Sequence, residues 1–153
     1  MQKESSDYRQ IIIARKDLDM SSGKLAAQVS HASMAFLSTM ISRNSFKNEH
    51  GEYECHMIID KELYEKWIRG IFTKIILEAK NKKHLEKAIN IANELGLQEG
   101  VDYFVIRDAC LTELEPEEYD KDSIGRTITC IGFRPMHKDN TYEISKKFQL
   151  FKQ

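Results

Sequence analysis

The stretch IIIARKDLDMSSGKLAAQVSHASMAF, residues 11–36, decides the fold of this chain. It opens on an apolar, β-branched run over residues 11–14, which is typical of a strand covered on both faces. A polar turn follows, and apolar residues at helical spacing then predict a helix over residues 24–41. Ser21 and Ser22 are both suitable N-caps for that helix. A buried strand that leads through a short turn into an amphipathic helix is typical of an α/β protein.

The rest of the chain repeats this alternation of strands and helices. Further strands are predicted over residues 73–79, 101–107 and 126–133, and further helices over residues 60–69 and 82–97. Gly96 supports the end of the second of these helices, and residues 146–151 are predicted as a short strand or an irregular segment. The order predicts an α/β sandwich whose sheet is covered by helices on both faces.

Length and composition are those of one domain over residues 1–153. With 41% hydrophobic and 31% charged residues the chain is not of the disordered class, and no apolar run reaches the ~18 residues of a membrane span. We expect residues 1–8 to be flexible, and residues 43–57 and 113–122 to form inserted loops. The odd number of cysteines, three, predicts reduced thiols in a cytoplasmic protein.

Charge is distributed unevenly along the chain. Residues 113–122, ELEPEEYDKD, hold six acids and one lysine, whereas the whole chain has a net charge of −1. An anionic partner would therefore bind a local basic surface and not the molecule as a whole. The alternative is a solvated acidic loop on a nearly neutral protein, and charge alone does not separate the two.

The first predicted helix carries one face that could bind an anion. Lys24, Gln28 and His31 are spaced i, i+4 and i+7, beside a helix N-terminus that Ser22 and Gly23 precede. Free backbone N–H groups there, together with the lysine, suit an anion or a developing oxyanion. A polar outer face of an ordinary surface helix is the alternative, and the pattern alone favours it.

Asp108 directly follows the predicted strand over residues 101–107, where a carboxylate can orient water or act as a general base. It could equally cap a turn or pair with Arg107. In α/β sheets, ligands usually bind beyond the carboxyl ends of the parallel strands. Asp108 and the turn before the first helix both belong to that edge.

Other chemistries have weaker support. Cys110, His31 and Asp108 could form a nucleophilic Cys/His/acid set, but residues so far apart in sequence produce such sets by chance. His50, Cys55 and His56 lack the spacing of zinc sites. The sequence contains neither GxGxxG nor a P-loop, so it predicts no nucleotide cofactor.

Three motifs together resemble the type II (archaeal and eukaryotic) peptidyl-tRNA hydrolases. IIIARKDLDMSSGKLAAQVSHA is similar to the first strand and helix of that family, with ten consecutive matching positions over residues 23–32. VIRDACLTEL resembles its I-R-D-A-G-x-T-x motif, and TITCIGFRP resembles its last strand. The similarity runs over about residues 9–151, and the C-terminal part also resembles a divergent eukaryotic branch of proteins that contain this domain.

The resemblance implies a three-layer α/β sandwich with a mixed sheet of roughly four strands, and a cytoplasmic homodimer. It implies hydrolysis of the ester bond between a peptide, or an N-blocked amino acid, and the 3′-terminal ribose of tRNA, with no metal, no other cofactor and no membrane. The family's functional residues fall on positions of this chain as follows: catalytic groups on Lys24, Asp108, Thr112 and Thr129, and substrate-binding groups on Gln28 and His31. Ser22 and Gly23 complete the substrate-binding set that we predict.

The chain also departs from the family pattern beside the predicted site. Cys110 stands where the family has glycine, and Leu111 stands where arginine is common. The acidic segment over residues 113–122 follows at once, and its carboxylates would repel tRNA phosphates if they faced them. A non-catalytic RNA- or protein-binding module on the same scaffold is therefore the alternative function.

Overall fold

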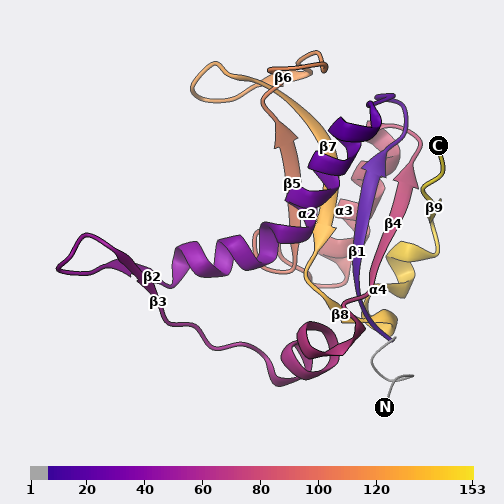
Figure 1. Cartoon of the computed structure of the whole chain (residues 1–153). Coiled ribbons are helices and arrows are strands. Elements are labelled where there is room, and N and C mark those ends of the chain that lie inside the picture. The colour runs from indigo at the N-terminus through magenta and orange to yellow at the C-terminus, as the bar shows by residue number, and fades with distance from the viewer. Residues whose placement is uncertain (1–6) are drawn as a thin grey trace.

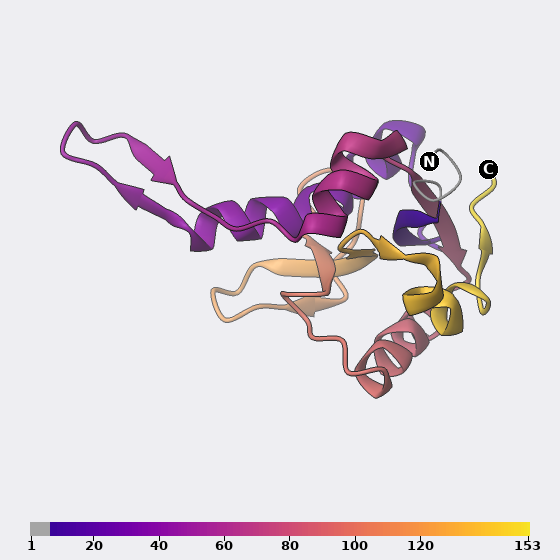
Figure 2. The same ribbon diagram turned by 90° about the horizontal axis from the view of Figure 1, so that it is seen from below.

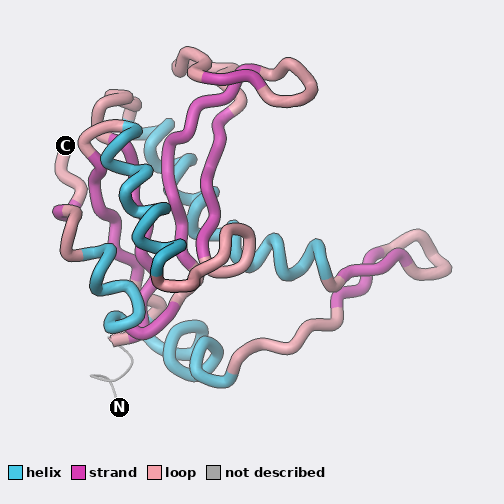
Figure 3. Tube along the Cα trace, turned by 180° about the vertical axis from the view of Figure 1, so that it is seen from behind, coloured by secondary structure: helices cyan, strands magenta, loops and turns pink. Residues whose placement is uncertain are grey.

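A sheet between two layers of helices forms the body of the molecule in the computed structural model, which describes residues 7–153 (Figures 1 and 3). Its main path has the strand order β5-β7-β1-β4-β9. The strands of this path are β1 (Tyr8–Arg15), β4 (Lys74–Ala79), β5 (Tyr103–Asp108), β7 (Gly125–Phe133) and β9 (Gln149–Leu150). Two more strands extend it, β6 (Glu118–Tyr119) beside β7 and β8 (Met136–His137) beside β1.

The sheet is mixed, as predicted, but it has seven strands, so the expectation of roughly four is wrong in number. The four predicted strands correspond to β1, β4, β5 and β7, and the additional strands have two residues each. Such short segments carry no readable alternation of apolar and polar residues. β6, β8 and β9 are strands because each pairs with a longer neighbouring strand.

Strand direction determines which ends share an edge. β1 pairs in parallel with β4, and β7 runs antiparallel to both β1 and β5. β1, β4 and β5 therefore point the same way, and their carboxyl ends lie at one edge of the sheet. This is the edge where α/β proteins usually bind ligands.

Helices cover both faces of the sheet, in agreement with the prediction. α2 (Ser22–Arg43) and the π-helical segment η1 (Leu63–Ile71) lie on one face, and α3 (Lys82–Glu94) and α4 (Lys138–Ser145) lie on the other (Figures 1 and 2). Ile11 and Ile13 pack toward α3, whereas Ile12 and Ala14 pack toward α2. The run over residues 11–14 is thus buried on both sides, which explains why it is continuously apolar.

One close approach sets the position of α2 on the sheet. The helix begins after Ser21, whose Oγ accepts a hydrogen bond from the Lys24 backbone N–H at 3.2 Å, so this N-cap is confirmed. Farther along, α2 crosses β7 at Gly132, where a Cβ atom would lie 2.1 Å from the carbonyl oxygen of Ala32. Only glycine permits that contact, which brings the middle of α2 onto β7 where Gly132 pairs with Phe104 of β5.

The far end of α2 projects beyond the sheet and carries a hairpin of β2 (Ser45–Lys47) and β3 (Tyr53–Cys55) (Figures 1 and 2). This projecting arm lies within the loop predicted over residues 43–57. Of the segment expected to be flexible, residues 1–6 lie outside the described residues, and Tyr8 is buried in β1. None of the described helices is both long and apolar enough to cross a membrane.

Candidate active site

An ion pair joins the first turn of α2 to the end of β5. Lys24 Nζ donates a hydrogen bond to Asp108 Oδ1 at 2.8 Å, and the two side chains are 12% and 13% exposed. The close approach of α2 to β7 described above brings these residues together although 84 positions separate them in sequence. The two strongest sequence candidates therefore share one partly open site.

Asp108 is held as a carboxylate by its surroundings. Burial raises the pKa of Asp108, but hydrogen bonds from Lys24 and from the Cys110 backbone N–H outweigh it, so the pKa lies below its usual value. The Cys110 N–H donates to Oδ2 at 2.9 Å, and Gln28 Nε2 donates to Oδ1 at 3.1 Å. Three donors thus fix the orientation of a group that is anionic at neutral pH.

Gln28 and Thr129 form a buried layer behind this carboxylate. Thr129 Oγ1 donates to Gln28 Oε1 at 2.5 Å, and both residues are almost completely buried. Accepting that bond turns the Gln28 amide so that its Nε2 faces Asp108. Thr129, predicted as a catalytic group, contacts Gln28, and no hydrogen bond among the described residues joins it to Asp108. Gln28, predicted to bind substrate, contacts the carboxylate.

The remaining predicted residues divide into two groups. Thr112 belongs to the site, because Lys24 Nζ donates to its Oγ1 at 3.1 Å and the threonine is exposed. Ser22 lies at the helix N-terminus with its hydroxyl within 3.5 Å of the Gln153 amide, and a Cβ atom at Gly23 would point into open space. The start of α2 thus borders the Lys24 and Asp108 site.

His31 is not brought to the site. It is exposed, and its side chain forms no hydrogen bond with any residue of the described range. The row of α2 that faces the sheet consists of Gln28, Ala32 and Phe36, and His31 lies about 100° away from Ala32 around the helix. The i, i+4, i+7 spacing predicted that His31 shares a face with Lys24 and Gln28, but His31 lies about two turns along the helix from Lys24.

The acidic loop is tied to the body of the molecule. Glu113 accepts hydrogen bonds from the Ser21 N–H at 2.9 Å and the Ser21 hydroxyl at 2.6 Å, which lower the pKa of Glu113. Glu117 and Asp17 both accept hydrogen bonds from Arg15, which is 3% exposed. These pairings were missed by sequence reasoning. The available signal was an arginine at the end of a buried strand, where a charge needs a partner.

Cys110 has a backbone conformation that explains the glycine of the family motif. Its φ of 57° lies in the left-handed region, which a side chain other than glycine adopts at a cost of about 1–2 kcal/mol. Its Sγ lies 3.5 Å from the Asp108 carbonyl oxygen and 3.4 Å from Thr127 Oγ1. No hydrogen bond in residues 7–153 links it to His31, so the structure does not assemble the Cys/His/acid set.

Among residues 7–153, no group of three or more His, Cys, Asp or Glu side chains is arranged to hold a metal ion. His50, Cys55 and His56 lie in the arm, where the His56 ring stacks on Phe46. The Lys24 and Asp108 site offers an oriented anion, a cation and a hydroxyl in one place. Such a set can hold a water molecule and stabilise negative charge on oxygen.

Comparisons with known proteins give one consistent result. The family model described as Peptidyl-tRNA hydrolase PTH2 matches residues 8–151. A peptidyl-tRNA hydrolase of Methanopyrus kandleri is 33% identical over 95% of this chain and 99% of its own length. Those of Sulfolobus acidocaldarius and Haloquadratum walsbyi are 35% and 32% identical, covering 81% and 94% of this chain and 83% and 99% of theirs.

Proposed function

Because this chain belongs to the peptidyl-tRNA hydrolase PTH2 family, we propose that it hydrolyses the ester bond between a peptide, or an N-blocked amino acid, and the 3′-terminal ribose of tRNA. The family membership inferred from the three sequence motifs is thereby confirmed. The observation that carries the assignment of the site is the contact between Lys24 Nζ and Asp108 Oδ1. This contact joins the strand–helix motif, which contains Lys24, to the VIRDACLTEL motif, which contains Asp108, at a partly exposed site.

The proposed reaction uses water as its nucleophile. Asp108 orients a water molecule and accepts one of its protons while the water oxygen attacks the ester carbonyl carbon. Negative charge develops on the carbonyl oxygen, where Lys24 and the Thr112 hydroxyl stabilise it. The bond from the carbonyl carbon to the ribose oxygen then breaks, and that oxygen takes up a proton. The products are a free peptide acid and tRNA.

The buried layer of Gln28 and Thr129 supports this role. Without the donor of Gln28, one oxygen of Asp108 would lose a bond that fixes its orientation. Lowering of the Asp108 pKa keeps the carboxylate ionised at neutral pH, which favours binding of water hydrogens. Its basicity is modest, so its main contributions are orientation of the water and stabilisation of the charge that the water acquires.

The experiment that tests the function is release of N-acetylated amino acid from N-acetylaminoacyl-tRNA by the purified chain with EDTA present. We expect multiple turnovers at a rate well above the spontaneous reaction, and no loss of rate on addition of the chelator. Absence of release above background from a folded protein would contradict the function. Such a result would favour the non-catalytic binding module, to which the 87% exposed Leu111 beside the site could contribute a contact.

The resemblance also implies a homodimer, and we propose that a second copy of this chain occupies the apolar groove between α2 and η1. The groove encloses about 530 Å³ and its apolar lining includes Met34, Leu37, Trp67 and Phe72. Lys74 borders it, with Nζ 3.5 Å from the centre of the Phe72 ring. A patch of this kind at the surface of a protein commonly marks an interface.

The projecting arm has the matching chemistry. Phe46 is 51% exposed and Tyr53 is 73% exposed on the hairpin, whose residues 45–55 contain three glutamates and one lysine. An acidic arm with exposed aromatic rings complements an apolar groove bordered by Lys74. Two copies could exchange arms in a symmetric contact.

Removing the aromatic rings of the arm is expected to weaken the dimer. The double variant Phe46→Ser/Tyr53→Ser should raise the dimer dissociation constant about thirtyfold or more, because buried interface aromatics commonly contribute about 2 kcal/mol. Sedimentation velocity over a concentration series measures this. Tyr119→Ser, which removes a 71% exposed ring from the acidic loop, is the matched control and should leave the constant unchanged. A parent protein that remains monomeric at every concentration would overturn the proposal.

We further propose that residues 1–153 act as one domain in the cytoplasm. The cysteines of the described range, Cys55, Cys110 and Cys130, are all free. Reduced thiols are typical of that compartment, and release of tRNA from peptidyl-tRNA serves translation there.

A further inference from the structure

The surface on the side of the sheet away from the acidic loop carries a series of lysines without ion-pair partners. Its members are Lys16, Lys80, Lys147 and Lys152, and we refer to them as the lysine track. Among residues 7–153 none of the four forms a salt bridge, whereas Lys24, Lys66, Lys138 and Lys146 all do. Lys80, Lys147 and Lys152 are exposed, and Lys16 is half-buried.

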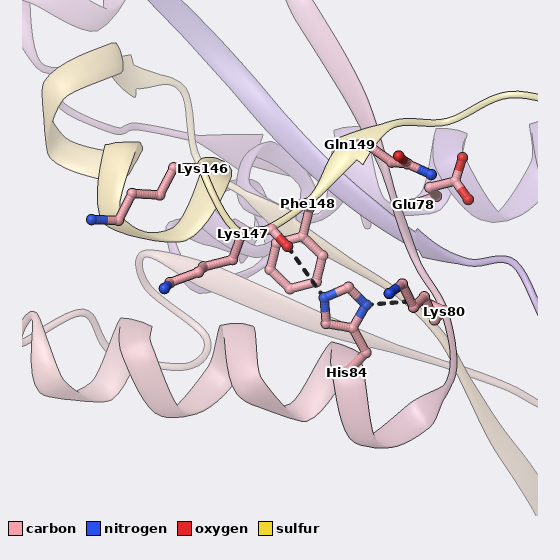
Figure 4. A pocket seen from close by; sticks show the side chains of 7 residues that line it. All are labelled: Glu78, Lys80, His84, Lys146, Lys147, Phe148 and Gln149. Carbon is pink, nitrogen blue, oxygen red and sulfur yellow. Dashed lines mark hydrogen bonds between the residues drawn. The ribbon is translucent and has the colours of Figure 1, made fainter.

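The far end of the track is a pocket beside the carboxyl end of β4. It encloses about 320 Å³ and is lined by Lys80, Lys147, His84 and Phe148 among others (Figure 4). The His84 ring stacks on Phe148 with 4.3 Å between ring centres, and its two nitrogens contact the backbone of Lys80 and Lys147. These contacts hold the two lysines on either side of one imidazole ring.

The C-terminal segment connects this pocket to the proposed active site. Phe148 packs in the cluster on the α3 face, and Phe151 packs in the cluster on the α2 face, so the segment crosses the edge of the sheet at β4. Lys16 Nζ lies 4.7 Å from the centre of the Phe151 ring. Gln153 then contacts Ser22, which lies in the first turn of α2 with Lys24. The segment with Lys147 and Lys152 therefore runs from the pocket to the first turn of α2, and Lys16 lies beside it.

The carboxylates near this path are few. Glu78 lines the pocket but is only 9% exposed, and it accepts a hydrogen bond from the Lys152 backbone N–H at 3.2 Å. Asp19 lines the intervening hollow together with Lys16 and Phe151. Within residues 113–122, β6 pairs with β7, which β1 separates from β4, whereas Glu113 and Glu117 reach Ser21 and Arg15 and accept hydrogen bonds from them. Attraction for a polyanion is therefore concentrated on the β4 side of the site.

We infer that the lysine track binds the phosphate backbone of the tRNA acceptor arm and directs it from the active site across the edge of the sheet at β4. The inference rests on the proposed function and extends it to a second binding surface. It also explains how an acidic loop can border the site of a tRNA hydrolase. Glu113 and Glu117 are held by Ser21 and Arg15, and the RNA leaves the site on the opposite side.

Charge reversal tests the track. In Lys80→Glu/Lys147→Glu we expect kcat/KM for N-acetylaminoacyl-tRNA to fall about tenfold or more, mainly through KM, because phosphate contacts supply binding without taking part in chemistry. The slope of log kcat/KM against log salt concentration should become shallower by about 2, which is about 1 for each lysine. Lys61→Glu/Lys121→Glu, which changes the net charge equally with exposed lysines that form no ion pair among the described residues, is the matched control and should retain the parent values.

A substrate without phosphates separates this inference from the proposed function. The N-acetylaminoacyl ester of adenosine contains the scissile bond and the terminal nucleoside only. We expect the track variant to hydrolyse it at the parent rate. If the track variant keeps the parent kcat/KM and salt slope on the tRNA substrate, the lysine track does not bind the tRNA backbone, although the proposed hydrolysis stands. If the parent protein hydrolyses neither substrate, the proposed function itself fails.

Discussion

Asp108→Asn is expected to lose at least about a hundredfold in the rate of peptidyl-tRNA hydrolysis while the protein remains folded. The substitution keeps the size of the side chain but removes the negative charge that orients the water and accepts its proton. An amide in this position also presents a donor that Lys24 Nζ cannot accept. Single-turnover release of N-acetylated amino acid at saturating enzyme measures the chemical step, and far-ultraviolet circular dichroism checks the fold.

A matched control lies in the same strand region. Asp102 is 15% exposed and pairs with Arg134 at 2.8 Å, so it resembles Asp108 in burial and in having a cationic partner. It precedes β5, whereas Asp108 ends β5. Asp102→Asn should therefore retain hydrolysis near the parent rate. Equal loss in both variants would mean that Asp108 acts through stability and not through chemistry.

Lys24→Met is expected to have an effect of similar size, again at least about a hundredfold in the single-turnover rate. Methionine keeps much of the aliphatic length of the side chain but removes the charge that stabilises the oxyanion. Lys138→Met is the matched control, because Lys138 Nζ also forms an ion pair, with Asp7 at 3.0 Å, remote from the site. Parent-like hydrolysis by Lys24→Met would remove this lysine from the mechanism.

Lys24→Met should also change the dependence of hydrolysis on pH. In the parent, the lowered pKa of Asp108 keeps the carboxylate ionised until the pH falls below the usual range of an aspartate. The ion pair accordingly stabilises the folded state at neutral pH, and that stabilisation is lost as the pH falls through the lowered value. Without Lys24, Asp108 loses a hydrogen bond and a nearby positive charge that lower its pKa, so the pKa of Asp108 rises from its value in the parent. The acidic limb of the residual activity should move to higher pH.

Much of the fold could be predicted because the informative residues are close together in sequence. The apolar run over residues 11–14 indicated a strand buried on both faces, and β1 is such a strand. Ser21 and the periodicity after it predicted α2, which is longer than expected by two residues at each end. The short strands β6, β8 and β9 and the helix α4 were missed or left open, since two to eight residues carry too little periodic signal.

The sequence indicated which residues could belong to the site, but not which of them are buried or contact one another. Spacing grouped Lys24, Gln28 and His31 on one face, yet the crossing of α2 over Gly132 buries Gln28 and leaves His31 outside. The role of Thr129 also depends on its burial, because the sequence does not show whether a threonine in a strand faces a ligand or a buried amide. Arg15 and Glu113 hold the acidic loop through long-range contacts that no local pattern encodes.

Whether Lys24 and Asp108 act as one unit is best measured with the double variant Lys24→Met/Asp108→Asn in the single-turnover assay. Groups that work on the same water and the same developing oxyanion are strongly non-additive. We therefore predict that the double variant hydrolyses N-acetylaminoacyl-tRNA within about tenfold of the slower single variant. A loss equal to the product of the two single losses, about ten-thousandfold or more, would show that the two groups act independently and would contradict the account.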